Sequence, residues 1–242
     1  MMRFLWRAYR ARFRDQRTEI RELRSSILPG EIAVDVGAHK GSYLYWLSQA
    51  AAPGKVFAFE PQPMLAEYLR TKCAAAGLKN VVVEAAGVSD HSGQMTLHVP
   101  GGTVSQGASF EGAILEEAEC QSYSVPVVTL DEYFQSRTQR IAAIKIDAEG
   151  HEFAVLRGAQ QILTQDAPCL TVECEARHLK QRSVADVLNY LESLGFHGSF
   201  VHRGQLRPIA EFDPQTHQKE TSGPFRGEKD YCNNFVLRKR AA

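Results

Sequence analysis

Short apolar runs alternate with amphipathic stretches along most of the chain. The apolar runs predict strands at residues 32–36, 56–60, 81–85, 125–130, 141–146 and 169–174. Segments with helical spacing lie among them, at residues 42–51, 64–76, 151–163 and 184–194. Such alternation is typical of a mainly parallel sheet with helices on both faces, whose buried strands are apolar throughout. We therefore predict a doubly wound α/β fold.

The N-terminal segment differs in charge from the rest of the chain. Residues 2–28 have helical spacing and end at Pro29-Gly30, which predicts a basic amphipathic helix over residues 1–29 and one α/β domain over residues 30–242. The chain has 28 basic and 28 acidic residues, yet residues 1–24 hold eight Arg against three acids. The remaining body is net acidic, which argues against a nucleic-acid partner.

Further patterns lie in the second half of the chain. The apolar runs at residues 196–201 and 231–237 have no helix between them, which predicts a hairpin and one antiparallel strand at the end of the sheet. Residues 94–99 alternate in polarity and predict an extra strand with one wet face. The polar, glycine-containing residues 100–124 and 204–229 are expected to be loops.

Cysteine usage and hydropathy indicate the compartment. The five cysteines are scattered and form no CxxC pair, as expected for reduced thiols. No apolar run approaches the roughly 20 residues that span a bilayer, and the first residues contain no apolar signal region. We predict a cytoplasmic protein.

A glycine turn follows the first predicted strand, in the segment Asp35-Val36-Gly37-Ala38-His39-Lys40-Gly41. Open α/β sheets bind ligands at the carboxyl ends of their strands, where Gly37 and Gly41 would let the backbone approach a ligand closely. The glycine spacing is not the GxGxxG that seats a pyrophosphate, so a ligand without phosphates fits better than a dinucleotide. A plain turn with two glycines is the alternative interpretation.

The second predicted strand ends in Glu60-Pro61. A carboxylate at this strand end can accept hydrogen bonds from both hydroxyls of a ribose. Glu60 follows Gly41 by 19 residues, close to the spacing of about 20 for an acid that binds ribose. An exposed acid at a strand end is common, so the combination with the glycine turn carries the prediction.

Acidic residues follow two later strands. Asp147 stands at the tip of the strand over residues 141–146, where it would face the ligand crevice. Glu149, His151 and Glu152 follow it and are expected to be helix-start residues, with His151 on the surface.

Glu173 and Glu175 lie on the same face of the next strand by alternation, where they can hydrogen-bond a polyol or an amine or simply solvate the strand end. Together with Asp147 they would offer a divalent ion three carboxylates, but no ligand spacing supports a site and we predict no metal.

Taken in order, these segments resemble the FkbM family of S-adenosylmethionine-dependent methyltransferases. The match spans roughly residues 30–200, and its segments are Val34 to Gly41, Phe59-Glu60-Pro61, Ala86-Gly87-Val88-Ser89-Asp90, Thr129-Leu130-Asp131 and Ile144 to Gly150. Three positions depart from the family pattern: His39 stands where Asn is usual, Lys40 where an apolar residue is common, and Gly87 where Ala is frequent.

The resemblance implies a class I methyltransferase (Rossmann-like) sheet, mainly parallel with one antiparallel strand near the C-terminus. It implies S-adenosylmethionine as the cofactor and a small-molecule acceptor whose hydroxyl, on a sugar or other metabolite, is O-methylated. The cofactor-binding residues that follow are Asp35, Gly37, Ala38, His39, Gly41, Glu60, Ala86 and Asp147. For the base that accepts the acceptor's proton, the candidates are Asp147 first, then Glu149 and Glu173.

Other function classes fit the sequence less well. An NAD-dependent oxidoreductase is disfavoured by the missing GxGxxG, and a nucleic-acid methyltransferase by the acidic body. A non-catalytic scaffold that binds the cofactor and recruits a partner through the N-terminal helix is the main alternative.

The basic N-terminal helix poses a separate question. Its Arg residues and its aromatic residues suit an anionic membrane surface, so peripheral membrane contact through residues 1–24 is one interpretation. Docking on the protein's own acidic body, or a dimer contact, is the other. We favour docking, because Asp15, Glu19 and Glu22 dilute the positive charge.

Overall fold

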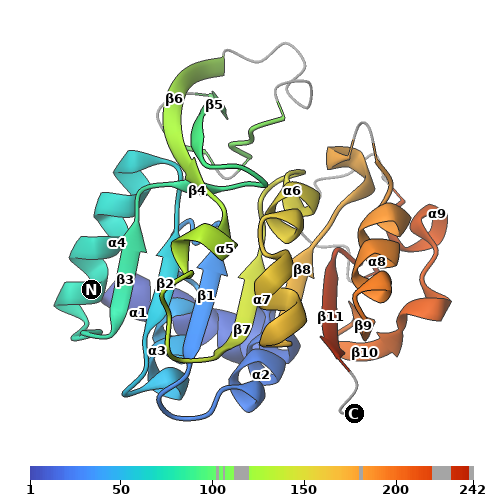
Figure 1. The fold of residues 1–242 in the computed structure, drawn as a ribbon, viewed down its shortest axis with the longest axis horizontal. Coiled ribbons are helices and arrows are strands. Elements are labelled where there is room, and N and C mark those ends of the chain that lie inside the picture. The colour runs from blue at the N-terminus through green and yellow to red at the C-terminus, as the bar shows by residue number, and fades with distance from the viewer. Residues whose placement is uncertain (102–103, 106, 112–119, 180–181, 220–229, 240–242) are drawn as a thin grey trace.

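An eight-stranded sheet forms the centre of the computed structural model, which describes residues 1–101, 104–105, 107–111, 120–179, 182–219 and 230–239. Its strand order is β10-β9-β11-β8-β7-β1-β2-β3 (Figure 1). The five parallel strands are β1 (Ile32–Val36), β2 (Val56–Phe59), β3 (Val81–Glu84), β7 (Ile141–Ile146) and β8 (Cys169–Glu173). The mainly parallel class I methyltransferase sheet expected from the sequence is confirmed.

The antiparallel part of the sheet differs in detail from the prediction. β11 (Asn234–Lys239) pairs antiparallel with both β8 and β9 (Phe196–His202), so it lies inside the sheet and not at its end. The two predicted strands do pair antiparallel with each other, as β9 and β11, but the hairpin that follows β9 is formed with β10 (Gln205–Pro208). Arg203 and Gly204 connect them with positive φ angles of 51° and 74°, which suit a two-residue hairpin turn.

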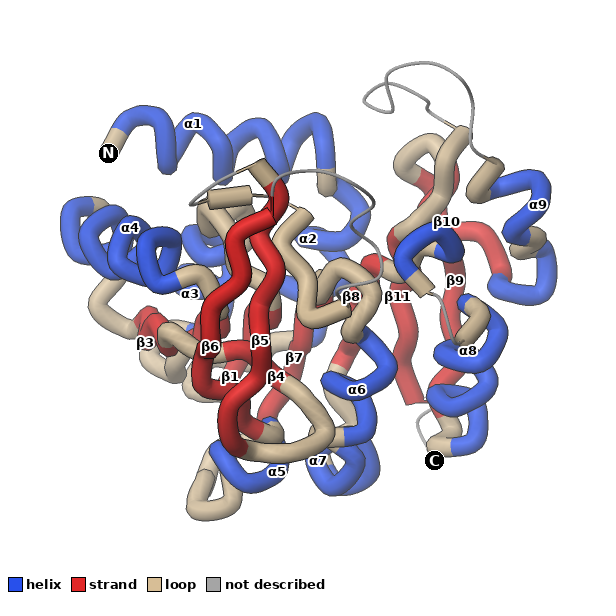
Figure 2. Tube along the Cα trace, turned by 90° about the horizontal axis from the view of Figure 1, so that it is seen from above, coloured by secondary structure: helices blue, strands red, loops and turns tan. Residues whose placement is uncertain are grey.

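Two layers of helices cover the sheet (Figures 1 and 2). One face packs against α1 (Met2–Arg10), α2 (Arg17–Ser26), α3 (Leu44–Ala51) and α4 (Pro63–Ala75). The other packs against α5 (Leu130–Tyr133), α6 (Glu152–Arg157), α7 (Gln160–Gln165) and α8 (Val184–Ser193). Alternate residues of β1 point to opposite faces, so that Ala33 joins one core while Ile32 and Val34 join the other.

A second, three-stranded sheet stands over the carboxyl ends of the parallel strands (Figure 1). Its order is β4-β6-β5, with bounds β4 (Gly87–Val88), β5 (Gly93–Pro100) and β6 (Cys120–Val128). The strand expected at residues 94–99 is therefore present as β5. The loop expected over residues 100–124 is partly strand, since β6 begins at Cys120, and residues 102–103, 106 and 112–119 lie outside the described residues.

Several predicted helices are interrupted. The segment at residues 2–28 consists of α1, a π-helical turn (Ala11–Asp15) and α2. The segment at residues 151–163 is divided into α6 and α7 at Gly158, where a Cβ atom would lie 2.0 Å from the carbonyl oxygen of Ser89. Close packing against another segment thus divides a stretch whose spacing predicts one helix.

The stretch predicted as a loop over residues 204–229 also contains regular structure. It includes β10, a 3-10 turn (Ile209–Glu211) and α9 (Pro214–His217), whose first turn is capped by the Asp213 side chain. Residues 220–229 lie outside the described residues.

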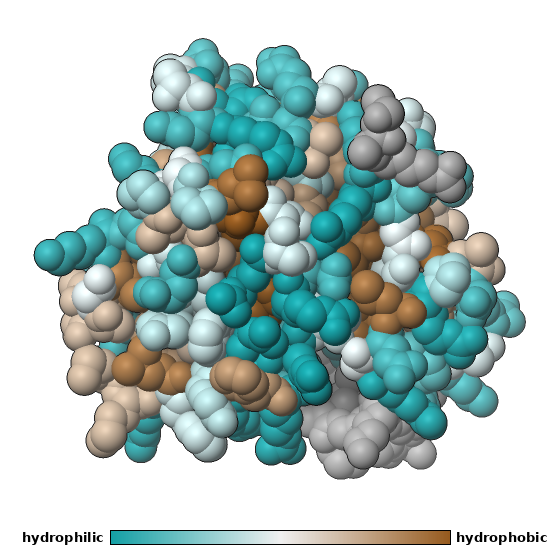
Figure 3. Space-filling model, turned by 90° about the horizontal axis from the view of Figure 1, so that it is seen from below, coloured by the Kyte–Doolittle hydropathy of each residue, from teal (hydrophilic) through white to brown (hydrophobic). Residues whose placement is uncertain are grey.

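The molecular surface is mixed in polarity. Viewed from below, apolar side chains form separate patches among hydrophilic ones (Figure 3). Within the described part of the chain, no helix is both long and apolar enough to cross a membrane.

Candidate active site

The glycine turn after β1 packs closely against the residue that follows β7. Gly37 has φ of 70°, and a Cβ atom there would lie 1.8 Å from the carbonyl oxygen of Asp147. Gly41 has φ of 76°, and its Cβ would press on the side chains of Leu69 and Phe4 at 2.8 Å. Both positions therefore require glycine. The close approach that they permit is between segments of this chain, whereas the sequence pattern suggested an approach to a ligand.

Glu60 holds the glycine turn in place. Its carboxylate accepts hydrogen bonds from the backbone N–H of His39 at 2.7 Å and of Gln62 at 2.9 Å. Burial raises the pKa of Glu60 to about 7, although the two backbone donors lower it. His39 adopts a left-handed φ of 46°, a region in which Asn, Asp and His are enriched. This backbone conformation gives a physical reason why His stands at a position where Asn is usual.

Lys145 joins the ends of β1 and β7 beneath the site. Its ammonium group lies 3.3 Å from Asp35 Oδ1 and 3.3 Å from Asp147 Oδ2, and it donates to the backbone carbonyl of Gly37 at 2.8 Å. Burial opposes its charge, but Asp147 and Asp35 outweigh burial and raise the pKa of Lys145. The buried cation thus contacts Asp147 at the edge of the crevice and Asp35 below it, although burial still raises the pKa of Asp35.

A cavity opens beside these groups, at the carboxyl ends of β1, β2 and β7. The predicted cofactor residues that line it are Gly37, His39, Glu60, Ala86 and Asp147. Three others do not line it, namely Asp35, Ala38 and Gly41. Its apolar lining includes Phe59, Val88, Leu97 and Phe110. Glu149, predicted as a base, also lies on its wall.

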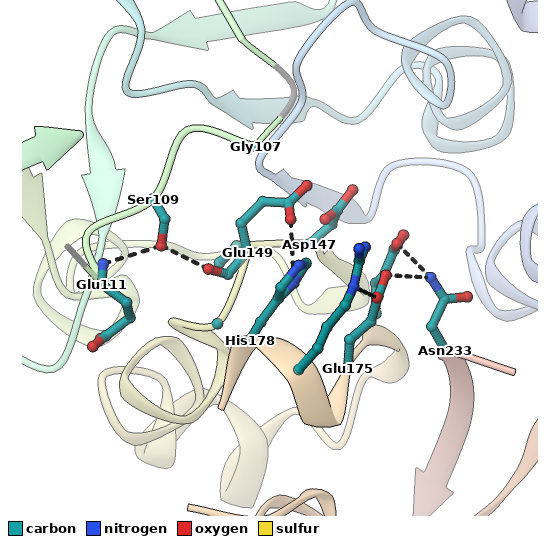
Figure 4. Close-up of polar contacts among 12 residues, drawn as sticks. Gly107, Ser109, Glu111, Asp147, Glu149, Glu175, His178 and Asn233 are labelled. Atoms are coloured by element: carbon teal, nitrogen blue, oxygen red, sulfur yellow. Dashed lines mark hydrogen bonds and ion pairs between the residues drawn. The ribbon is translucent and has the colours of Figure 1, made fainter. Parts of the chain in front are cut away.

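Residues 107–111 form one wall of the cavity and are tied to the main sheet. Ser109 donates to the backbone carbonyl of Glu149 at 2.7 Å (Figure 4). The Glu111 carboxylate lies 3.1 Å from His151 Nδ1. Phe110 lines the cavity and packs against Gly87, where a Cβ atom would lie 2.4 Å from Phe110 Cζ. The absence of a side chain at position 87 therefore makes room for the Phe110 ring.

Carboxylates gather at the ends of β7 and β8 next to the cavity (Figure 4). Glu149 Oε2 lies 3.3 Å from Nδ1 of His178. Asn233 donates to both Glu173, at 2.6 Å, and Glu175, at 2.9 Å, so these two acids share one partner, as strand alternation predicts. We call the group Asp147, Glu149, Glu173 and Glu175 the acidic crevice.

The four acids of the acidic crevice differ in their electrostatics. Burial, followed by the charge of Asp147, raises the pKa of Glu149 to about 8. Burial and the same neighbour raise the pKa of Glu173 well above its ordinary value. Burial also opposes ionisation of Glu175, but Arg177 and Asn233 outweigh it and lower its pKa. The crevice therefore combines two acids whose pKa values are raised, Glu149 and Glu173, with one acid that is ion-paired to Arg177 and one that is paired to Lys145.

The residues at the start of α6 have mainly structural contacts. Glu152 accepts hydrogen bonds from the backbone N–H of Ala148 and Gly150, both at 3.0 Å, which confirms its expected role at the helix start. His151 is not a surface residue, contrary to the prediction, because it is buried between Glu111 and the hydroxyl of Ser89 at 3.0 Å. Among the described residues, no group of three or more His, Cys, Asp or Glu side chains is placed to hold a metal ion.

Four residues of the site were not identified from the sequence, namely Phe110, Lys145, His178 and Asn233. Lys145 had a visible signal, because a lysine within an otherwise apolar buried strand requires a partner. The other three come from loops or short turns distant in sequence from the motifs, and only the fold brings them to the cavity.

The sequence matches the methyltransferase FkbM domain family over residues 35–197. This match covers more than half of the chain and includes the glycine turn, Glu60 and Asp147. The chain therefore belongs to the FkbM family of S-adenosylmethionine-dependent methyltransferases. S-adenosylmethionine is its cofactor, and an NAD-dependent oxidoreductase is excluded. No curated relative matches the chain.

Solved structures share the fold at low sequence identity. The methyltransferase FkbM from Methylobacillus flagellatus is 17% identical with a TM-score of 0.55, covering 86% of this chain and 43% of that one. A proposed methyltransferase from Streptococcus mutans, in complex with SAH, is 13% identical with a TM-score of 0.53 and covers 94% and 98%. An O-methyltransferase from Thermotoga maritima is 14% identical with a TM-score of 0.50 and covers 95% and 66%. The chain thus spans less than half the length of the Methylobacillus protein.

The cavity suits S-adenosylmethionine on its own chemistry. It combines a buried strand-end carboxylate, Glu60, with an apolar wall that includes Val88, Leu97 and Phe110. A ribose diol can hydrogen-bond to the carboxylate, and an adenine ring can pack against the apolar wall. The acidic crevice adjoins the cavity, since Asp147 and Glu149 line both.

Proposed function

We propose that the protein O-methylates a hydroxyl of a sugar or another small polyol. The acidic crevice is the observation that carries this proposal. Its carboxylates offer several hydrogen-bond acceptors within one small space, beside the Asn233 amide that donates to two of them, which suits an acceptor with several hydroxyl groups. Outside residues 1–24 the chain is net acidic, which would repel the phosphates of a nucleic acid, so a small-molecule acceptor is favoured over RNA or DNA.

The cofactor is proposed to lie across the carboxyl ends of β1 and β2. Glu60 would accept hydrogen bonds from the ribose hydroxyls, and Phe110 would pack against the adenine. Asp147, held by Lys145, would orient the methionine part. When bound, S-adenosylmethionine supplies an electrophilic methyl group on its sulfonium. The remaining task of the protein is to position the acceptor in line with it and to exclude water.

Glu149 is the carboxylate best suited to accept the acceptor's proton. A base is most effective when its pKa lies near the working pH, and the pKa of Glu149 is raised to about 8. Asp147, the first candidate from the sequence, is ion-paired with Lys145, while Glu173 accepts a hydrogen bond from Asn233 and has a pKa that burial raises well above its ordinary value. His178 contacts Glu149 and would orient its carboxylate.

The acceptor class can be tested by methyl transfer from radiolabelled S-adenosylmethionine. The panel should contain monosaccharides and other polyols, small amines and ribosomal RNA. We expect a polyol to be labelled at oxygen. The rate of this labelling should fall at least 100-fold in Glu149→Gln. Labelling of only the amine or only the RNA by the folded protein would contradict the proposal.

The cytoplasmic compartment stays a prediction.

The role of Glu60 can be tested by calorimetric titration with S-adenosylhomocysteine, with NADH as the ligand control. Losing a hydrogen bond to a charged group costs about 1.5–3 kcal/mol, so Glu60→Ala should bind roughly 10- to 100-fold more weakly. Glu84 ends the neighbouring strand β3, and its carboxylate accepts a hydrogen bond from the Tyr133 hydroxyl at 2.6 Å. Glu84→Ala is the matched control and should bind S-adenosylhomocysteine normally. Wild-type affinity in Glu60→Ala would disprove the ribose contact.

A further inference from the structure

Helix α1 has two apolar faces on opposite sides. Its inner face is buried, with Phe4 and Ala8 each 1% exposed, and Phe4 packs beside Gly41 of the cofactor turn. Its outer face carries Met2, Trp6 and Tyr9, which are 82%, 61% and 52% exposed. One apolar face is enough to dock a helix on its own domain, so docking leaves the outer face unexplained.

The outer face continues along the π-helical turn as a row of aromatic rings. Trp6 stacks on Tyr9 with ring centroids 5.7 Å apart, Tyr9 lies 4.7 Å from Phe13, and Phe13 lies edge-on to Trp46 at 5.8 Å. We call this group, together with Met2, the aromatic row. Of the nine large apolar side chains that are exposed in the described residues, five belong to residues 1–13, so this concentration is specific to α1 and its extension.

Arginines flank the aromatic row. Exposed arginines on α1, the π-helical turn and the start of α2 are Arg3, Arg10, Arg14 and Arg17. Helical spacing places Arg3 and Arg10 together on one side of the row, because they follow Met2, Trp6 and Tyr9 by one or four positions, and Arg14 directly follows Phe13 in the π-helical turn. Asp15 is the one acid in residues 1–17, and it pairs with Arg10 at 3.0 Å and Arg14 at 3.5 Å.

Two of the three acids that dilute the charge in the sequence do not do so on this surface. Glu19 is buried with 4% exposure. Glu22 pairs instead with Arg21 at 2.9 Å and with Arg238 of β11 at 3.0 Å. The outer surface of α1 is therefore more basic than the composition of residues 1–24 suggests.

From this arrangement we infer that the aromatic row and its flanking arginines bind the surface of an anionic membrane. Trp and Tyr favour the interface between headgroups and acyl chains, and arginines attract anionic headgroups. A second copy of the chain fits less well, because a two-fold contact would bring the same arginines of both copies together. The helix would lie in the plane of the interface, with its inner face still packed on the cofactor turn.

Vesicle co-sedimentation with the full chain tests this inference. Vesicles of phosphatidylcholine with one third phosphatidylglycerol should retain the protein, and vesicles of phosphatidylcholine alone should not. Trp6→Ser/Phe13→Ser should abolish retention. Arg3→Gln/Arg14→Gln should lower the partition coefficient on the order of 10- to 30-fold and reduce its dependence on salt.

Matched variants of other exposed residues serve as controls. Met64→Ser on α4 removes an apolar side chain that is 59% exposed, and Lys55→Gln/Lys79→Gln removes two exposed charges elsewhere. Both should bind vesicles like the wild type.

Two results would overturn the inference. One is failure of the folded wild type to bind the anionic vesicles. The other is a dimer in sedimentation velocity that Trp6→Ser/Phe13→Ser converts to monomer, because the surface would then be a contact between copies. S-adenosylhomocysteine binding, measured in parallel, shows whether each variant is folded.

Discussion

Glu149 and Glu173 lie in the same crevice but are expected to act differently. Glu149 must lose its proton to act as a base, and its pKa is raised to about 8, so kcat/KM of the wild type should rise with pH through about 8 and then level off. Glu149→Gln should lower kcat by about 10²–10⁴-fold and remove this rise. Methyl transfer to the best polyol acceptor, measured between pH 6 and 10, checks both effects.

Glu173→Gln is the matched control for this prediction. Burial raises the pKa of Glu173 well above its ordinary value, and Glu173 accepts a hydrogen bond from Asn233 that the amide oxygen of Gln can also accept. This variant should keep most of its turnover and the same rise with pH. If Glu149→Gln keeps the rise and Glu173→Gln loses it, the base is Glu173 and our assignment is wrong.

Single residues of the site could be predicted where a motif and a strand end coincide. Glu60 and Asp147 each follow an apolar run directly, and the structure places both on the cavity. The contacts that set the charge of these acids could not be predicted. Lys145 meets Asp35, and His178 meets Glu149, only because the fold brings them together. The sequence spacing therefore locates the acids but does not indicate which of them carries a proton.

At the scale of elements, the segment over residues 107–111 is expected to bind cofactor through its fit to β4. Gly87→Ala would place a Cβ atom 2.4 Å from Phe110 Cζ and displace the ring from the cavity wall. We expect Gly87→Ala and Phe110→Ala to weaken S-adenosylhomocysteine binding by similar factors, about 3- to 20-fold for one aromatic contact. The double variant should bind no more weakly than either single one, because both changes remove the same contact.

Gly107→Ala is the control within the same segment. Among the described residues, a Cβ atom at position 107 would meet nothing closer than Pro100 Cγ at 4.0 Å, so this variant should bind the cofactor normally. Calorimetry on the wild type, the two single variants and the double variant completes the Gly87/Phe110 cycle. Additive losses in Gly87→Ala/Phe110→Ala would contradict the proposed fit.

Elements were predictable where burial alone determines them. The five parallel strands are apolar because both faces are covered, and each was predicted within about two residues of its bounds. Breaks within helices depend on contacts with distant segments, as at Gly158 against Ser89, and hydrophobic spacing does not report such contacts. The position of β11 between β8 and β9 is likewise decided by pairing, not by its own sequence.

At the scale of the whole molecule, buried carboxylic acids should make stability depend on pH. Glu19 on α2 is 4% exposed, and burial raises its pKa to about 7, while Glu60 and Glu152 are raised to about 7 and Glu149 to about 8. These values exceed the unfolded value of about 4.3, so the folded state binds more protons between these pH values. Their contribution to stability is complete below about pH 4 and is lost as the pH rises toward 8.

Glu19→Gln isolates one of these terms, because Glu19 lies outside the cavity and the acidic crevice. An amide carries no charge to desolvate, so at pH 8 the variant should be more stable than the wild type by about 2–3 kcal/mol, or on the order of 5–10 °C in Tm. At pH 4, where Glu19 is largely protonated in both the folded and the unfolded state, the two proteins should melt at nearly the same temperature. Calorimetric melting at both pH values measures the difference, with Glu67→Gln as the control, since the Glu67 side chain is 70% exposed. An equal stabilisation at both pH values would mean that better packing, and not the buried charge, is responsible.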